Sequence, residues 1–259
     1  MLYQGYKHSP SSGNMWIDSP SAFIWRYGFK HWGKNVPRTT MGKAAEQAAY
    51  DAIFGGGTPA EAEKHALGLF ELYAEDQFPM HDQETGEVIP ELAASGAIAK
   101  RFVELLLPLG KPEKREPREA IAVPGLDRRV NYEIDLFYPA HGIVDLKATM
   151  KMPWGEGKEP TPRVSHVRQQ GLYSKLRNAP ASLLYATPKR GEIYRIPDAN
   201  GRMGAEELMM AFRQIERWDE KFPAPEEAIS FIPLQTDTFW WDDEAEVKEA
   251  NKLWRKYNA

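Results

Sequence analysis

Two aspartates and a lysine lie within one short apolar segment of this 259-residue chain, NYEIDLFYPAHGIVDLKAT (residues 131–149). The segment reads as two strands around a Pro-Ala-His-Gly turn, and Asp135 and Asp145 stand in the apolar middles of those strands. Because strand side chains alternate between faces, Asp145 and Lys147 share a face. A three-residue turn followed by a left-handed Gly142 would place Asp135 opposite Asp145. A four-residue turn would shift the register by one residue and separate the two carboxylates.

Two facing carboxylates repel each other, and a divalent cation between them removes the repulsion. Mg²⁺ prefers oxygen ligands and is often held by one or two carboxylates together with a substrate phosphate. A lysine on the same face can orient or deprotonate the attacking water, or stabilise negative charge on the reacting phosphorus. The segment therefore predicts a metal-dependent site for phosphodiester hydrolysis. The alternative is an edge hairpin at the surface with an Asp145–Lys147 ion pair.

A helix predicted over residues 164–177 follows the second strand. Gln169 and Tyr173 are four residues apart and so lie on one helical face, with His166 and Arg177 near the same stripe. Amide and phenol groups in this place suit contacts with a DNA backbone or support of the active site. The alternative is an ordinary amphipathic helix whose Gln169 is solvated.

The charge distribution agrees with a phosphate-facing surface near this helix. The net charge is -4, yet residues 146–195 hold ten Lys or Arg against three Asp or Glu. Arg168 and Arg177 belong to this basic block, and His166 is the histidine best placed to contact DNA. A solvated basic face is the alternative.

Upstream, Glu46 stands among small residues in GKAAEQAA (residues 42–49). Glycine and alanine permit close packing of this helix on a sheet, which would partly bury Glu46 and call for a partner such as a metal ion. A solvated Glu46 on the outer face is the alternative.

The predicted elements run in the order helices, three strands, helix, two strands, helices. We therefore expect an α/β fold in which a central mixed β-sheet is flanked by helices. A single domain spans residues 1–259, with a core at about 19–196 and an acidic helical extension at about 197–259. The predicted strands cover residues 120–123, 129–138, 143–149, 182–186 and 192–196, and a loop covers 111–118. The predicted helices cover residues 20–32 (capped by Ser19), 41–54 (capped by Thr39 or Thr40), 58–75 (opened by the capping box Thr58 to Glu61), 90–107, 164–177, 205–218 and 242–257.

In chain order the motifs are Ser21-x-Phe23, Gly42-x-x-x-Glu46, Asp135, Asp145-x-Lys147 and Gln169-x-x-x-Tyr173. Over residues 19–196 this pattern resembles the PD-(D/E)XK nucleases of the RecB-like branch, which includes phage recombination exonucleases and CRISPR-associated exonucleases. The resemblance implies a restriction-endonuclease-like core with an N-terminal helical elaboration.

Site roles also follow from the resemblance. It implies metal ligation by Glu46, Asp135, Asp145 and the backbone carbonyl of Leu146. Asp135, Asp145 and Lys147 would form the catalytic set, and Gln169 and Tyr173 the motif on the following helix. Many relatives have histidine where Glu46 stands.

The function so implied is a Mg²⁺-dependent deoxyribonuclease, an exonuclease of phage or bacterial recombination or repair, with Mn²⁺ as a substitute. The chain has no cysteine, so no iron–sulfur cluster is expected. The expected partners are DNA and a recombinase or single-strand-binding protein. No apolar run predicts a membrane span, and the expected location is the cytoplasm of a bacterium or phage-infected host. The oligomeric state stays open. The alternatives are a structure- or sequence-specific endonuclease, a non-catalytic DNA-binding module, and an α/β protein whose motif matches are coincidental.

Overall fold

The contacts within the chain divide it into two compact units, each assembled from separated segments. The computed structural model describes residues 2, 5–33, 35–82, 84–113, 119–155, 157–241 and 243–258. The unit that contains both ends of the chain, here called the terminal unit, comprises Met1–Gly33, Arg118–Glu133 and Arg202–Ala259. The central unit comprises Lys34–Pro117 and Ile134–Gly201.

These units divide the chain differently from the predicted core and extension. Residues 19–33, which were predicted to belong to the core, group with the C-terminal segment instead. The prediction of a single domain over residues 1–259 stays a prediction.

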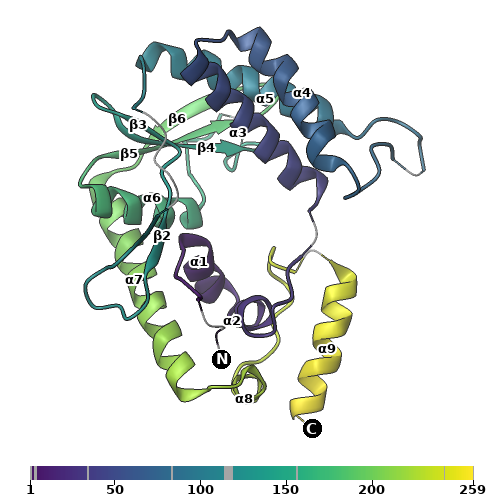
Figure 1. The fold of residues 1–259 in the computed structure, drawn as a ribbon, viewed down its shortest axis with the longest axis vertical. Coiled ribbons are helices and arrows are strands. Elements are labelled where there is room, and N and C mark those ends of the chain that lie inside the picture. Colours follow the sequence, from purple (N-terminus) through teal and green to yellow (C-terminus); the bar gives the residue numbers. More distant parts are fainter. Residues whose placement is uncertain are drawn as a thin grey trace. The chain divides into compact units, whose positions relative to one another are not determined.

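A mixed β-sheet forms the centre of the central unit, as predicted, and has four strands (Figure 1); the strand predicted over residues 120–123 lies in the terminal unit instead. The strand order of the mixed sheet is β3-β4-β5-β6, with β4 and β5 parallel and both outer pairs antiparallel. A parallel pair needs a long crossover, and α6 supplies it here. The bounds are β3 Leu136–Tyr138, β4 Gly142–Ala148, α6 Val164–Arg177, β5 Ala181–Ala186 and β6 Gly191–Arg195.

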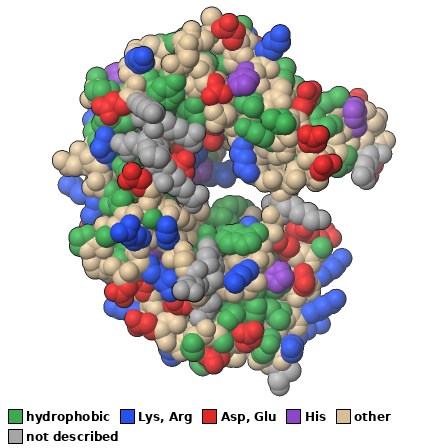
Figure 2. Space-filling view, viewed as in Figure 1, with side chains coloured by type: hydrophobic (Ala, Val, Ile, Leu, Met, Phe, Trp, Pro, Cys, Tyr) green, Lys and Arg blue, Asp and Glu red, His purple; other side chains and the backbone are tan. Residues whose placement is uncertain are grey.

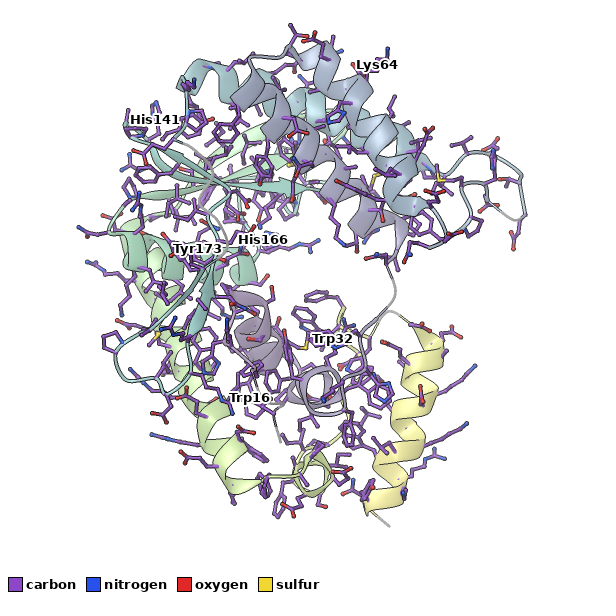
Figure 3. All side chains as sticks on the ribbon, in the orientation of Figure 1. Trp16, Trp32, Lys64, His141, His166 and Tyr173 are labelled. Carbon is purple, nitrogen blue, oxygen red and sulfur yellow. The ribbon has the colours of Figure 1, made fainter. Side chains whose placement is uncertain are left out.

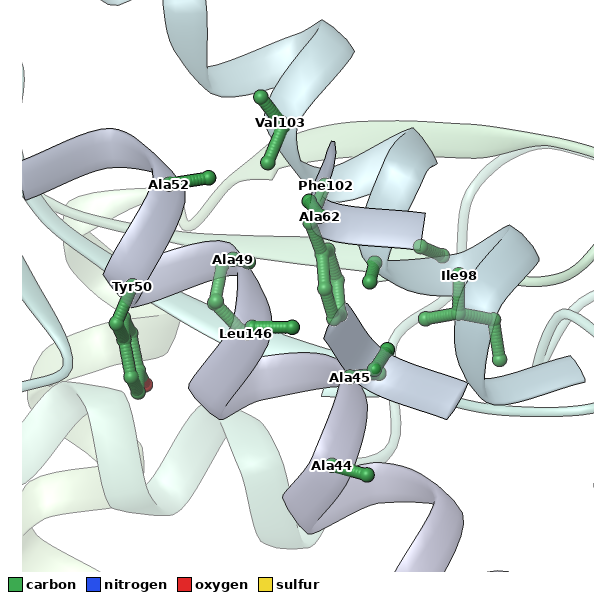
Figure 4. Packing of buried hydrophobic residues seen from close by; sticks show 14 of the residues in the cluster. Ala44, Ala45, Ala49, Tyr50, Ala52, Ala62, Ile98, Phe102, Val103 and Leu146 are labelled. Carbon is green, nitrogen blue, oxygen red and sulfur yellow. The ribbon is translucent and has the colours of Figure 1, made fainter. Parts of the chain in front are cut away.

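Three helices pack together in the same unit and form one hydrophobic core with the sheet (Figure 4). Alanines of α3, among them Ala44, Ala45 and Ala49, are fully buried there, and their small side chains permit close approach to Leu146 of β4 and Phe102 of α5. This packing presents one face of α3 to the strand that carries the predicted catalytic residues. The bounds are α3 Pro37–Gly55, α4 Pro59–Ala74 and α5 Pro90–Leu106, followed by the 3₁₀ turn η2 Leu107–Leu109.

The terminal unit is mostly helical and its core is aromatic. Phe23 and Trp25 are fully buried, and Trp16 packs edge-on against Phe23 with the ring centroids 5.3 Å apart. A two-stranded antiparallel sheet of β1 and β2 completes the unit. The bounds are α1 Pro10–Asp18, α2 Pro20–Phe23, the π-helix η1 Ile24–Gly28, β1 Glu119–Ile121, β2 Val130–Tyr132, α7 Asp198–Lys221 (residues 198–201 in the central unit), α8 Pro225–Ile229 and α9 Glu244–Asn258.

A buried polar cluster links the first segment of the terminal unit to α7. His8 is fully buried, and its Nε2 lies 2.9 Å from Oε1 of Glu216. The same carboxylate oxygen accepts hydrogen bonds from the backbone N–H groups of Asp127 and Arg128 at 3.0 and 2.8 Å. Phe212 stacks on the imidazole, with the ring centroids 4.5 Å apart. Each polar group named here is therefore hydrogen-bonded inside the unit.

Two predicted helix starts are confirmed and one is wrong. The side chain of Ser19 caps α2, and Thr58 forms a capping box with Glu61 at the start of α4. The helix predicted to be capped by Thr39 or Thr40 begins earlier, at Pro37. Proline is favoured at the first helical position because its φ is already helical and its missing N–H needs no partner there.

Other element predictions were incomplete. Helix α1 was missed although Ser9 and Ser12 form a capping box at its start. Helix α7 is longer than the predicted residues 205–218, α8 was not predicted, and the aromatic helix predicted over residues 20–32 turns into a π-helix after Phe23. Residues 114–118 of the predicted loop and residue 242 of the last predicted helix lie outside the described residues. Among the described helices, none has the length and hydropathy needed to cross a membrane.

The strand predicted over residues 129–138 is in fact two strands in different units. Strand β2 ends at Tyr132 and β3 begins at Leu136. Between them, the carboxylate of Asp135 accepts a hydrogen bond from the backbone N–H of Leu146 at 3.0 Å. The last backbone pair between β3 and β4 joins Leu136 and Val144. Beyond it, the Asp135 side chain takes up the N–H group of Leu146, and the pairing between the two strands ends there.

Candidate active site

The hairpin between β3 and β4 has the predicted register. Tyr138 pairs with Gly142 and Leu136 with Val144, so the turn holds three residues. Gly142 has φ +82°, and a Cβ atom at this position would lie only 2.1 Å from the backbone oxygen of Pro180. Glycine is therefore required both for the left-handed conformation and for the close approach. Continuing the same register places Asp135 opposite Asp145.

Three polar side chains, two from β4 and one from α6, meet at this point. Nζ of Lys147 lies 2.5 Å from Oδ2 of Asp145. The amide of Gln169, on α6, donates to Oδ1 of the same aspartate at 3.3 Å. With Asp135 held by the N–H of Leu146, the two predicted catalytic aspartates, the lysine and the predicted helical amide come together in the central unit.

Burial decides the electrostatics of this group. Asp145 is 2% exposed, and burial raises the pKa of its carboxyl group; the Lys147 ammonium lowers that pKa, and the neighbouring Asp135 raises it. Burial also opposes the charge on Lys147, but the carboxylates of Asp145, Asp135 and Glu46 together raise its pKa above the ordinary value. A protonated lysine therefore compensates a carboxylate that is otherwise unfavourable in a buried site.

Glu46 reaches this site from α3. It is partly buried, and its charge acts on Lys147 together with those of the two aspartates. It also borders a pocket of about 420 Å³, whose other lining residues include Asn35 and Lys43. Glu46 is partly buried, as the small residues around it predicted. The positive charge of Lys147 attracts its carboxylate.

The carboxylates suit a hard cation, because their oxygens are the ligands that Mg²⁺ prefers and burial disfavours the charge of Asp145 without a cation nearby. Within the described residues, no three His, Cys, Asp or Glu side chains are grouped closely enough to form a metal site. The ion pair between Lys147 and Asp145 supplies the positive charge in this arrangement. Metal ligation by Glu46, Asp135, Asp145 and Leu146 stays a prediction.

Near the start of α6, the structure places Tyr185 of β5 beside His166, and the sequence pattern had singled out only the histidine. Tyr185 on β5 is the register partner of Lys147 on β4, so both side chains project from the same face of the sheet. The Tyr185 hydroxyl lies 2.7 Å from Nδ1 of His166 and accepts a hydrogen bond from the backbone N–H of Arg163 at 3.2 Å. Strand pairing between residues 147 and 185 was not predicted, and period-two alternation within each strand was the only signal available.

The remaining predicted DNA contacts differ in exposure. Tyr173, labelled with His166 in Figure 3, is only 5% exposed, so this residue serves the packing of α6 more than a surface contact. Arg177 is more accessible; its guanidinium lies 3.6 Å from the Glu113 carboxylate and 4.7 Å from the centroid of the Phe137 ring. Arg168 is partly buried on the same helix. On the face drawn in Figure 2, acidic and basic side chains are interspersed.

Comparisons with known proteins bear on the fold. No protein-family model matches the chain, and no curated protein matches it by sequence. A crystal structure from Eubacterium rectale, described as a "Putative exonuclease", aligns with a TM-score of 0.54 and 14% identity over 82% of this chain and 79% of that chain. A second structure, SSO0001, aligns with a TM-score of 0.31 and 16% identity over 66% and 74% of the two chains, which is too low to support an argument. The first alignment shows a shared fold.

Proposed function

We propose that this protein hydrolyses phosphodiester bonds of DNA with the help of a divalent cation. The observation that supports this most directly is the convergence of Asp135, Asp145 and Lys147 with Gln169 in one buried group. A buried lysine beside two carboxylates suits a reaction in which extra negative charge develops on a phosphate. The fold shared with the protein described as a "Putative exonuclease" supports the same proposal.

The cation would be Mg²⁺, with Mn²⁺ as a substitute, held by Glu46, Asp135, Asp145 and the backbone carbonyl of Leu146. When bound, such an ion lowers the pKa of a water molecule and offsets charge on the phosphate. Lys147 is placed to stabilise the additional negative charge that develops on the phosphate as the water oxygen bonds to phosphorus and the ester P–O bond breaks. Gln169 holds Asp145 through its amide and so limits the orientations of that carboxylate.

Exonuclease action is proposed in preference to internal cleavage because the structure with the same fold is described as an exonuclease. DNA is the proposed substrate, since residues 146–195, which include Lys147 and Gln169, carry more basic than acidic side chains and a phosphate backbone is negatively charged. A role in phage or bacterial recombination or repair, beside a recombinase or single-strand-binding protein, belongs to the same proposal.

The test is digestion of end-labelled linear duplex and covalently closed circular DNA with Mg²⁺, with Mn²⁺ and with excess EDTA. The proposal expects release of nucleotides from linear DNA, an intact circle, and no product in EDTA. Cleavage of the circle would replace exonuclease with endonuclease action. Undiminished cleavage in EDTA would refute the metal-dependent mechanism, and no cleavage of any DNA substrate would refute the function.

A further inference from the structure

We infer that Tyr185 is a positioning residue that holds His166 as a neutral imidazole with its proton on Nε2, ready to donate a hydrogen bond to a phosphate oxygen of the substrate. The tautomer is inferred from the hydrogen bonds of Tyr185 and does not depend on the proposed function, whereas the phosphate contact rests on that function. Nothing in the motif pattern involves Tyr185.

The direction of the hydrogen bonds decides the tautomer. The Tyr185 oxygen accepts the backbone N–H of Arg163 at 3.2 Å, and its single O–H proton, in a nearly fully buried side chain, requires an acceptor of its own. Nδ1 of His166 lies 2.7 Å from that oxygen and is the available acceptor. A histidine that accepts at Nδ1 carries its proton on Nε2 when it is neutral.

The surroundings keep the imidazole neutral. Burial, together with the positive charges of Lys147 and Arg163, lowers the pKa of His166 to about 2. A positively charged imidazole would stand next to two cations, so protonation at Nδ1 is opposed by charge as well as by the tyrosine. His166 thus differs from a surface histidine, which gains a proton near pH 6.5.

The position of the pair points to substrate. Tyr185 is 1% exposed and packs edge-on against Trp154, with the ring centroids 5.2 Å apart, so its hydroxyl is held rigidly. His166 is partly buried, and its Nδ1 faces the tyrosine, so Nε2 lies on the opposite side of the ring from Tyr185. Tyr185 and Lys147 share a face of the sheet, so the donor stands on the same side as the lysine. A neutral N–H donor beside a lysine suits a phosphodiester oxygen, since it donates a hydrogen bond to the anion while the lysine keeps its proton and its charge.

The chain offers a matched control for removal of the Tyr185 hydroxyl. Tyr138 on β3 is also 1% exposed, and in the described part of the chain its hydroxyl has no hydrogen-bond partner. Tyr185→Phe and Tyr138→Phe therefore delete the same atom from the same sheet, and only the first removes a hydrogen bond to the site. A general loss of packing would affect both variants alike.

The first experiment is nitrogen-15 NMR of the histidine rings in the intact protein, with the His166 signals identified by their loss in His166→Gln. The inference expects a pyridine-type Nδ1 and a pyrrole-type Nε2 between pH 5.5 and 8. Tyr185→Phe should move the Nδ1 signal toward a mixture of tautomers, and Tyr138→Phe should leave it unchanged. A protonated Nδ1 in the wild-type protein, alone or as imidazolium, would overturn the inference.

The second experiment measures binding of a labelled duplex with Ca²⁺ in place of Mg²⁺, which separates binding from turnover. Loss of one neutral hydrogen bond predicts affinity about threefold to tenfold weaker for Tyr185→Phe, with Tyr138→Phe equal to wild type. His166→Leu should be weakened at least as much as Tyr185→Phe, and His166→Gln, which keeps an N–H donor, should recover part of the affinity. Unchanged binding by Tyr185→Phe and His166→Leu would overturn the phosphate contact. Failure of the wild-type protein to bind DNA would overturn the proposed function and the phosphate contact together, and would leave the NMR result on the tautomer standing.

Discussion

The terminal and central units each bury a carboxylate beside a nitrogen-containing side chain, His8 in the first and Lys147 in the second. The two carboxylates differ in the donors and charges around them. Glu216 is 9% exposed, and one of its oxygens accepts from His8 and two backbone N–H groups. Asp145 is 2% exposed and has a second carboxylate, Asp135, nearby. The first group is a set of donors around one acceptor, whereas the second concentrates like charges around one lysine.

This difference separates a stabilising cluster from a reactive one. A buried network in which every member is satisfied holds segments of the chain together. A buried group with crowded like charges is unfavourable for folding. Its charge interactions change when a cation or an anionic substrate binds, which is typical of functional sites. The comparison therefore predicts that substitutions in the terminal cluster affect stability, whereas substitutions in the central group affect chemistry.

The largest expected effect is the loss of stability in Glu216→Ala. Three donors lose their common acceptor inside the unit, so we expect the free energy of unfolding to fall by about 3–5 kcal/mol. Urea denaturation gives this value from the shift in midpoint at an unchanged slope. Glu220→Ala, at an exposed position of the same helix, is the control. Equal midpoints for the two variants would remove the distinction between the clusters.

Lys147→Met should affect catalysis more than stability or metal binding. It keeps the length of the side chain and removes the ammonium 2.5 Å from Asp145, so we expect single-turnover cleavage to slow by about a hundredfold or more. Metal affinity should persist or rise because a nearby positive charge opposes the cation, whereas Asp145→Asn should weaken metal binding and cleavage together. Calorimetric titration of metal into both variants measures this, with Lys151→Met at an exposed position as control. A near wild-type rate for Lys147→Met would leave the lysine with a structural role only.

A smaller effect should distinguish Glu46 from Glu133, which is two residues from Asp135 on the same face of the predicted strand and is the alternative outlying ligand. Glu46 acts on Lys147 through its charge and lies in the central unit, whereas Glu133 belongs to the terminal unit. We expect Glu46→Ala to slow cleavage by about tenfold or more, and Glu133→Ala to cleave at close to the wild-type rate. Cleavage rates over a range of Mg²⁺ concentrations show whether added metal restores activity. The reverse ranking would contradict the placement of α3 beside the site.

The smallest expected effect is a pH dependence of stability in the terminal unit. Burial lowers the pKa of His8 below its ordinary value of 6.5, although Glu216 acts in the opposite direction. Below pH 6.5 the unfolded chain therefore binds a proton that the folded chain does not. The stabilising contribution of neutral His8 is complete above pH 6.5 and is lost as the pH falls toward the folded pKa. Melting temperatures from pH 8 to 5 should decline less for His8→Gln than for wild type, and parallel curves would contradict this assignment.

Local patterns predicted much of the central unit because they depend on neighbours in the chain. Short apolar runs between turns located β4, β5 and β6, and the four-residue spacing located α6. The three-residue turn before Gly142 was predicted from its sequence and is confirmed by the strand register. The start of α3 was predicted wrongly, because Thr39 and Thr40 both looked like caps while Pro37 begins the helix.

The boundary of β3 could not be predicted in the same way. Residues 129–138 have a continuous strand pattern, so nothing local marks a break at residues 133–135. The break depends on the hydrogen bond between Asp135 and the N–H of Leu146, eleven residues away in the chain. As a result Glu133 and Asp135 belong to different units although they are two residues apart.

The sequence by itself determined which residues of β4 share a face and which residues of α6 lie along one stripe, because backbone geometry sets both periods. It also indicated the glycine that the hairpin requires. Only the tertiary structure decided that Tyr185 stands beside Lys147, that His166 accepts the tyrosine's hydrogen bond, and that the charge of Glu46 reaches the lysine. These relations depend on strand order and on the packing of α3 and α6, and they join residues separated by 19 to 101 positions. No local pattern specifies them, because burial and contact arise only when distant segments pack together.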